Sequence, residues 1–299
     1  MTAHPAHAHP AHAAHPRLLA GVAGEQRPAA RTARSSAPGS RPSPSERNRA
    51  MDPRPFFDAH FHVIDSRFPL FERDGYLPGE FTVQQYRERT AALDVVGGAV
   101  VSGSFQGFDQ SCLLDALAQL GPGFVGVAQI PHDLPDEEVV RLAERGVRGV
   151  RFNLRRGGSA GVEHLDALAR RIHRVAGMHI ELYVDARDLP ELAGILAALP
   201  AVSVDHLGLH ADGLPHLLEL VERGVRVKAT GFGRVELDVP QALRAVLNVD
   251  PTALMAGTDL PSTRARRPFA DTDLRLVAEV AGEHLDGVMY GNAAAFYRV

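Results

Sequence analysis

The histidines His60 and His62 are the first residues in the chain whose type and spacing could do chemistry. One residue separates them, and the surrounding run, residues 56–65, is apolar and aromatic, which is typical of a buried strand. Alternate strand residues point to the same face, so we expect the two imidazoles side by side and Phe61 on the other face. Imidazoles are common ligands of divalent metals. The spacing therefore indicates either part of a metal site or a structural pair of histidines.

Further polar residues stand at or just after the ends of later strand-like runs. They are Ser102, Ser104, Gln129, His132, Arg151, Asn153, Arg155, Arg156, Tyr183, Asp185, Asp205, His206, Lys228, Thr230 and Asp259. If the strands are parallel, their carboxyl ends meet at one edge of the sheet, and these side chains converge with the histidine pair. His179 begins a strand-like run instead, and we interpret it as structural.

Lys228 is the only lysine among the 32 basic residues. Lysine offers a compact ammonium, and arginine does not replace it in that role. Lys228 lies in a strand-like run, where it could stabilise negative charge that develops during a reaction. The alternative is an ordinary ion pair with an acid such as Asp205.

The elements that must position these residues alternate regularly between strand and helix. The strand-like runs are 56–65, 97–102, 124–130, 147–153, 179–184, 202–206, 225–230 and 253–259. The helical patterns are 83–94, 109–120, 136–145, 162–176, 187–198, 213–223, 239–248 and 271–281, with a short one at 291–297. Eight such units predict an α/β fold, a (β/α)8 TIM barrel. A doubly wound open sheet is the alternative, but no Gly-rich phosphate-binding loop follows the first strand.

Composition divides the chain into two parts. Residues 1–50 are low in complexity and rich in Ala, Pro, Arg, Ser and His, which predicts a disordered tail. Residues 51–299 are long enough for one barrel domain, and Met51 could be the start of the protein. The tail carries a net charge of +5, so the total of −4 leaves about −9 on the barrel. This acidic barrel argues against nucleic acid as a partner.

Two further features concern the environment of the protein. The chain has one cysteine, Cys112, so it can form no internal disulfide, and we expect a reducing compartment, the cytoplasm. No apolar run is long enough to cross a membrane, so we expect no membrane partner. The sequence leaves the oligomeric state open, a homodimer included.

Five motifs, in this order along residues 56–299, resemble the amidohydrolase superfamily, specifically the amidohydrolase-2 group that includes 2-pyrone-4,6-dicarboxylate lactonase and sugar-acid lactonases. They are Asp58-Ala59-His60-Phe61-His62, Val204-Asp205-His206-Leu207-Gly208, Val227-Lys228-Ala229-Thr230-Gly231, Gly257-Thr258-Asp259-Leu260-Pro261 and Gly291-Asn292-Ala293-Ala294-Ala295-Phe296-Tyr297. The resemblance implies a TIM-barrel hydrolase. It also implies metal positions at His60 and His62, a sixth-strand histidine at His206 and a base at Asp259.

The sequence departs from the metal-dependent pattern at the end of the fifth strand. Many members have a histidine there, whereas this chain has Tyr183-Val184-Asp185. His60, His62 and Asp259 would give three metal ligands, and His206 could give a fourth. The lactonase branch resembles this reduced set and can work without metal. The expectation is thus a divalent metal, zinc before others, or no cofactor.

The resemblance and the residues together predict a hydrolase that opens the lactone of a carboxylated or polyhydroxylated acid. Asp259 would act as the general base, His60 and His62 would polarise the carbonyl, and His206 and Lys228 would stabilise the negative charge. Six residues are candidates for binding a small anionic substrate: Ser104, Arg151, Asn153, Arg155, Arg156 and Tyr183. The alternatives are a metal-dependent decarboxylase or hydratase of the same superfamily and a non-catalytic barrel that binds a small acid. The non-catalytic alternative requires that Asp259 does not face the histidine pair.

Overall fold

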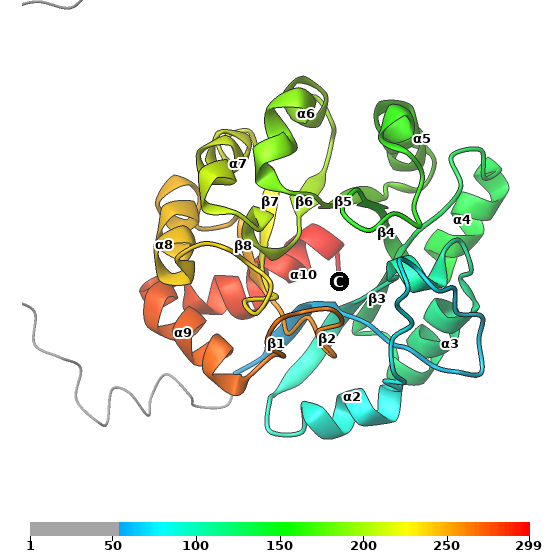
Figure 1. Cartoon of the computed structure of the whole chain (residues 1–299), viewed down its shortest axis with the longest axis horizontal. Helices are drawn as coiled ribbons and strands as arrows, with labels where there is room; N and C mark the ends of the chain where they lie inside the picture. The colour runs from blue at the N-terminus through cyan, green and yellow to red at the C-terminus, as the bar shows by residue number, and fades with distance from the viewer. Residues whose placement is uncertain (1–53) are drawn as a thin grey trace, which may run out of the picture. The chain divides into compact units, whose positions relative to one another are not determined.

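A sheet of eight parallel strands forms the centre of the molecule in the computed structural model, which describes residues 54–299 (Figure 1). The strands pair in chain order from β1 to β8. Their bounds are Phe56–Phe61 (β1), Val95–Val101 (β2), Phe124–Ala128 (β3), Val147–Asn153 (β4), His179–Tyr183 (β5), Val202–Val204 (β6), Arg226–Ala229 (β7) and Leu254–Ala256 (β8). The tail predicted for residues 1–50 lies outside the described residues.

Helices connect successive strands and surround the sheet (Figure 1). Their bounds are Val83–Arg89 (α2), Ser111–Leu120 (α3), Asp136–Glu144 (α4), Leu165–Ala176 (α5), Leu189–Leu196 (α6), Leu214–Val221 (α7), Val239–Val249 (α8), Asp271–Ala281 (α9) and Asn292–Tyr297 (α10). This order confirms the predicted (β/α)8 barrel and excludes the open doubly wound sheet.

The barrel is nearly closed between its last and first strands. The Asp259 amide donates to the His60 carbonyl at 2.7 Å, and the His62 amide donates to the Leu260 carbonyl at 2.7 Å. These bonds place the segment after β8 beside the end of β1. Residues 198 and 199 positions apart in the sequence thus become neighbours at the carboxyl edge of the sheet.

Several element ends differ from the sequence prediction. The helix predicted for 83–94 ends at Arg89, and the strands predicted for 202–206 and 253–259 end at Val204 and Ala256. In these two cases the predicted strand includes polar residues past the point at which the backbone leaves the ladder. His206 and Asp259 have φ values of 52° and 58°, a left-handed conformation that a strand does not contain.

The apolar core has two parts. The larger one fills the space between the strands and the surrounding helices, and the smaller one lies inside the barrel. The smaller cluster includes Phe57, Val101, Met255 and Tyr297 of α10. The Tyr297 ring stacks on Phe57 at 5.3 Å and also contacts His179, the first residue of β5, so α10 packs against the amino ends of the strands. The amino end of the barrel is therefore filled, and the carboxyl end remains for a site.

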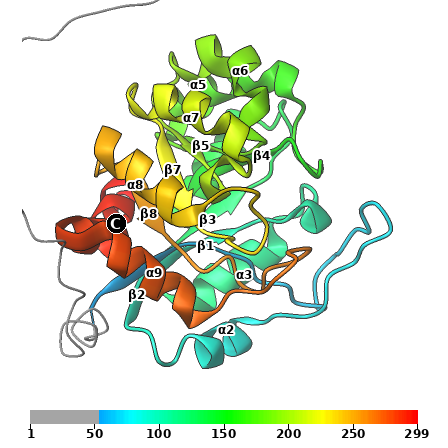
Figure 2. The same cartoon turned by 60° about the vertical axis from the view of Figure 1, so that its left-hand side comes forward.

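Figure 2 shows the loop after β1 and the loop after β8 on the side of the barrel away from α10. Among the described residues, no helix is long and apolar enough to span a membrane.

Candidate active site

The side chains of His60 and His62 lie next to each other at the carboxyl end of β1, as predicted. Their ring centroids are 5.0 Å apart, and both side chains are buried. Phe61 points away from them and stacks on Tyr86 of α2 at 3.8 Å. The strand alternation thus separates a packing residue from two residues that face the barrel interior.

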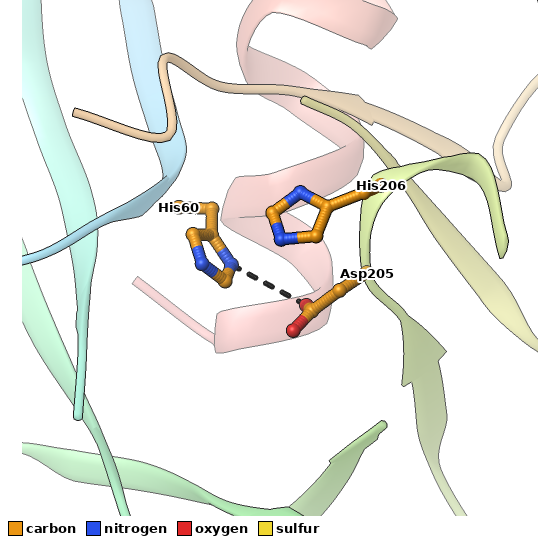
Figure 3. Close-up of side chains that lie close together, drawn as sticks. All are labelled: His60, Asp205 and His206. Atoms are coloured by element: carbon orange, nitrogen blue, oxygen red, sulfur yellow. Dashed lines mark ion pairs between the residues drawn. The ribbon is translucent and has the colours of Figure 1, made fainter. Parts of the chain in front are cut away.

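His206, from across the barrel, and Asp259, from the segment beside β1, join the histidine pair. The Nε2 atoms of His60, His62 and His206 each lie 3.9 Å from the same oxygen, Asp259 Oδ1. Figure 3 shows His60 from β1 facing His206 from the turn after β6. Asp259 Oδ1 and His60 Nε2 are buried and make no hydrogen bond within the described chain. Buried polar atoms normally have partners, so this cluster is shaped to receive a further group.

The backbone around His206 and Asp259 is held in a costly conformation. Left-handed φ values at non-glycine residues cost about 1–3 kcal/mol each, and they concentrate at functional sites. Gly231, in the loop after β7, has φ +63°, and a Cβ at this position would lie 2.6 Å from His206 Nδ1. Only glycine therefore allows this loop to pass so close to the His206 ring.

Burial controls the protonation of the three imidazoles. Desolvation lowers the pKa values of His60, His62 and His206, because no water remains to stabilise an imidazolium. The neighbouring cations lower the pKa of His206 further, Arg234 most of all. The three rings are therefore neutral near pH 7. His62 Nδ1 lies 2.7 Å from the Val101 carbonyl, which can only accept, so His62 carries its proton on Nδ1 and its Nε2 offers a lone pair.

Arg234 is a residue of the site that the sequence analysis missed. Its Nε donates to Asp259 Oδ2 at 2.9 Å, and its guanidinium makes a second bond to the same oxygen. Burial opposes the charge of Arg234, but Asp259 and Tyr183 outweigh it and raise the pKa of the guanidinium. Arg234 thus holds the Oδ2 oxygen of Asp259, and the Oδ1 oxygen faces the imidazoles. The only sequence signal for Arg234 was its position in the loop after β7, five residues past the end of the strand.

A second group of charges lies beneath the imidazoles, inside the barrel. Lys228 forms an ion pair with Glu181 and approaches Asp205 Oδ1 to 3.5 Å, and Arg151 binds Asp205 Oδ2 at 2.8 Å. Burial opposes ionisation of Glu181, but the Lys228 ammonium and the hydrogen bond from His179 together outweigh it and lower the pKa of the carboxyl to about 2. The sequence analysis missed Glu181, because a single acid in the middle of a strand carries no motif.

Most of the predicted substrate-binding residues line a cavity above the imidazoles. Those that line it are Ser104, Arg151, Asn153, Arg156 and Tyr183, together with His62, His206 and Arg234. Arg155 lines an adjoining cavity instead. Lys228 lines neither cavity, because it lies below His60.

The loop after β1 borders this cavity. Tyr76 from that loop and Arg264 from the loop after β8 both line it, and the Arg264 guanidinium lies 4.5 Å from the centre of the Tyr76 ring. Arg264 also donates to the Arg73 carbonyl and approaches Asp74 to 3.4 Å. The two loops are therefore joined at one side of the cavity.

The donor positions fit a metal ion. Two sets of side chains, His60 with His62 and Asp259, and His60 with Asp205 and His206, offer ligand atoms within 4.8 Å of one another. The buried Asp259 Oδ1 and His60 Nε2, which make no hydrogen bond within the described chain, are atoms that such an ion would bind. Imidazole nitrogen and carboxylate oxygen are the ligand types that zinc takes.

Residues 57–299 match the family model described as Amidohydrolase. A 2-pyrone-4,6-dicarboxylate hydrolase of Comamonas testosteroni is 35% identical over 156 residues, 50% of this chain and 51% of that protein. The match therefore spans about half the length of this relative. A 4-sulfomuconolactone hydrolase of Rhizobium radiobacter is 26% identical over 253 residues, 77% of this chain and 84% of that protein.

Solved structures share the fold of this chain. A probable 2-pyrone-4,6-dicarboxylic acid hydrolase of Acinetobacter baumannii, with citric acid bound, superposes with a TM-score of 0.72 at 21% identity and covers 82% of this chain and 99% of its own. A putative 2-pyrone-4,6-dicarboxylic acid hydrolase of Pseudomonas putida gives a TM-score of 0.70 at 25% identity over 81% of this chain and 97% of its own. These similarities agree with the barrel described above.

Proposed function

We propose that this chain, which belongs to the amidohydrolase family, hydrolyses a lactone that carries carboxylate groups. The observation that carries the proposal is the convergence of three neutral imidazoles on the free oxygen of Asp259, at 3.9 Å each. This spacing leaves room for the reacting atoms between a base and several polar nitrogens. The names of the relatives, hydrolases of a pyrone and of a muconolactone, support the same class of substrate.

In the proposed reaction Asp259 Oδ1 takes a proton from a water molecule. The water oxygen bonds to the lactone carbonyl carbon, and the carbonyl oxygen becomes an oxyanion beside the imidazoles. The ring C–O bond then breaks, and the leaving oxygen takes the proton that Asp259 holds. The product is the open-chain hydroxy acid. Arg234 on Oδ2 keeps the carboxylate oriented throughout, so that Oδ1 points to the water.

The charges around the site favour a reaction without metal. Three buried carboxylates, on Glu181, Asp205 and Asp259, are matched by three cations, on Lys228, Arg151 and Arg234. The imidazoles are neutral, and each of these three carboxylates already has a cation partner, so none of the three brings uncompensated negative charge to a divalent ion. Zinc is the alternative proposal. His60, His62 and Asp259 would hold it, and it would polarise the carbonyl and acidify a bound water.

The arginines around the cavity divide into neutralised and free residues. Arg151 and Arg234 have acid partners in the site, and Arg187 is paired with Asp185. Among the described residues, Arg155 and Arg156 have no acidic partner within 4.0 Å. We therefore propose that Arg156, which lines both cavities, binds a carboxylate group of the substrate. Arg155, in the adjoining cavity, attracts the anionic substrate towards the site.

A decarboxylase or hydratase of the same superfamily is the second candidate, and a tightly held metal would favour it. The non-catalytic alternative requires Asp259 to be turned away from the histidine pair. Asp259 Oδ1 instead lies 3.9 Å from the Nε2 atoms of His60 and His62, so the structure argues against this alternative.

Cys112 is the only cysteine and is buried and unpaired, which fits our proposal of a cytoplasmic enzyme.

The test is hydrolysis of a set of lactones with zero, one or two carboxylates, before and after removal of metal by a chelator. We expect ring opening that is faster for carboxylated lactones and that persists in metal-free protein. Loss of activity on chelation, with recovery on zinc addition, would favour the zinc version. Failure to open any lactone, with release of CO₂ from a carboxylated substrate, would overturn the proposal in favour of the decarboxylase.

A further inference from the structure

Lys228 has three acceptor atoms around its ammonium group. It lies in β7 and is fully buried inside the barrel. Its Nζ binds Glu181 Oε2, lies 3.3 Å from His60 Nδ1 and lies 3.5 Å from Asp205 Oδ1. A lysine ammonium has three protons and no lone pair. Glu181 Oε2 and His60 Nδ1 therefore each accept one of these protons, provided that His60 Nδ1 carries no proton, and Asp205 Oδ1 attracts the ammonium at ion-pair distance.

The other arrangement places a proton on His60 Nδ1 and directs it at Asp205 Oδ1, which is also 3.3 Å away (Figure 3). Two observations argue against it. Asp205 Oδ1 makes no aligned hydrogen bond within the described chain, whereas the approach of Lys228 to His60 Nδ1 has hydrogen-bond geometry. A proton on Nδ1 would also face the ammonium protons at 3.3 Å, donor against donor, and remove one of the three acceptors of Lys228.

We propose that Lys228 fixes His60 as the tautomer with its proton on Nε2, so that His60 donates a hydrogen bond to the lactone carbonyl instead of binding a metal. Lys228 is then a positioning residue, because it touches His60 and not the substrate. Glu181 holds Lys228 from the opposite side. The proposal rests on the proposed lactone hydrolysis for its role in the reaction, but the tautomer itself can be observed without any substrate.

The two histidines of the first motif then have opposite roles. His62 donates from Nδ1 to the Val101 carbonyl, so its Nε2 accepts. His60 accepts at Nδ1, so its Nε2 donates. A nitrogen that carries a proton has no lone pair for a metal, so ligation by His60 would require Lys228 to lose one of its three acceptors. The only lysine of the chain thus opposes metal binding at a position where the ligand atoms are otherwise suitably spaced.

Nitrogen NMR of the full-length, ¹⁵N-histidine-labelled protein tests the tautomer directly. His60→Gln identifies the His60 signals by their disappearance. We expect a protonated Nε2 and an unprotonated Nδ1 for His60, and the reverse for His62. A protonated His60 Nδ1 in the wild-type protein would overturn the proposal, whatever the variants do.

The double variant Glu181→Gln/Lys228→Met tests the cause. It removes one charge of each sign, so the net charge around His60 stays constant and no unpaired ion is left in that pair. We expect the His60 proton to move to Nδ1, towards Asp205, while His62 stays unchanged. An unchanged His60 tautomer in the folded double variant would show that Lys228 does not set it.

Zinc binding and kinetics give two independent readouts in the same proteins. In the double variant we expect zinc affinity to rise about tenfold, as changes around a ligand typically produce, and the rise to vanish when His60→Gln is added. The difference in bound zinc between the double variant and this triple variant excludes zinc that histidines elsewhere in the chain hold, because both proteins contain those histidines. We expect kcat for lactone opening to fall about 100-fold, the effect of losing one oxyanion donor, with little change in KM.

The two proposals fail in different ways. An Nε2-protonated His60 in a protein that opens no lactone would reject the reaction and retain the role of Lys228. Lactone hydrolysis by a protein with an Nδ1-protonated His60 would reject the role of Lys228 and retain the reaction.

Discussion

The two ends of the barrel interior are built from opposite kinds of residue. The amino end is filled by apolar side chains such as Phe57 and Met255 and covered by Tyr297 of α10. The carboxyl end contains three carboxylates, three cations and three neutral imidazoles, all nearly or completely buried. This difference between the two ends shows how a barrel can accommodate buried charged groups. Close packing at one end stabilises the fold, so the other end can hold polar groups at fixed separations for chemistry.

The upper and lower halves of the polar end also differ. In the upper half Asp259 Oδ1 and His60 Nε2 have no partner within the described chain, whereas in the lower half Lys228 and Glu181 satisfy each other. We expect substitutions in the upper half to change the reaction directly. Substitutions in the lower half should change stability and should change the reaction only through the protonation of His60.

The largest expected effect is the loss of the base. Asp259→Asn cannot accept the water proton, and we expect kcat to fall about 10³-fold, within the range of general-base catalysis, with a small change in the melting temperature. Steady-state kinetics and thermal unfolding measure both quantities. The control is Asp185→Asn, at the edge of the adjoining cavity, for which we expect less than a threefold change. Retention of a tenth of the kcat by Asp259→Asn would refute the role of Asp259.

Removal of Lys228 alone should have the largest effect on stability. Lys228→Met leaves the Glu181 carboxylate buried without its cation, and breaking such a pair costs about 3–5 kcal/mol. Urea unfolding should show this loss. The double variant Glu181→Gln/Lys228→Met should recover most of it, because no unpaired charge remains between the two. Equal stability of the single and double variants would mean that the pair does not act as a unit.

A smaller effect is expected at the rim of the cavity. Arg156→Gln should raise KM for a dicarboxylated lactone about tenfold and change kcat little, because a single charge-assisted contact contributes about 1.5–3 kcal/mol at most. The matched control is Arg187→Gln, an arginine that already has Asp185 as its partner. We expect a change below twofold there. Equal effects of the two variants would indicate general electrostatic attraction instead of a specific contact.

The smallest effect tests the filled end of the barrel. The Tyr297 hydroxyl donates to Glu181 Oε1 at 2.5 Å. Tyr297→Phe should lower the free energy of unfolding by about 1.5–3 kcal/mol, the contribution of one hydrogen bond to a charged group. Since Lys228 still holds Glu181, kcat should stay within threefold of the wild-type value. A loss of kcat comparable to that of the Lys228 double variant would show that the two ends of the barrel are coupled.

The sequence by itself determined the fold and the family. The alternation of strand and helix patterns predicted the barrel, because parallel strands require long crossovers, and the ordered motifs predicted the amidohydrolase family; both predictions are confirmed. The sequence also predicted that His60 and His62 share a face, since strand alternation is a local property. The residue roles at the site stay predictions, as does the choice between zinc and no metal.

Only the tertiary structure decided which charges meet. Arg234, Glu181 and Tyr297 come from different elements, and nothing in their local sequence indicates the partners Asp259 and Lys228. The physical reason is that partner choice across a barrel depends on its closure, which brings together residues far apart in the chain. The closure also left Lys228 beside His60 Nδ1, a contact on which the protonation of the site depends.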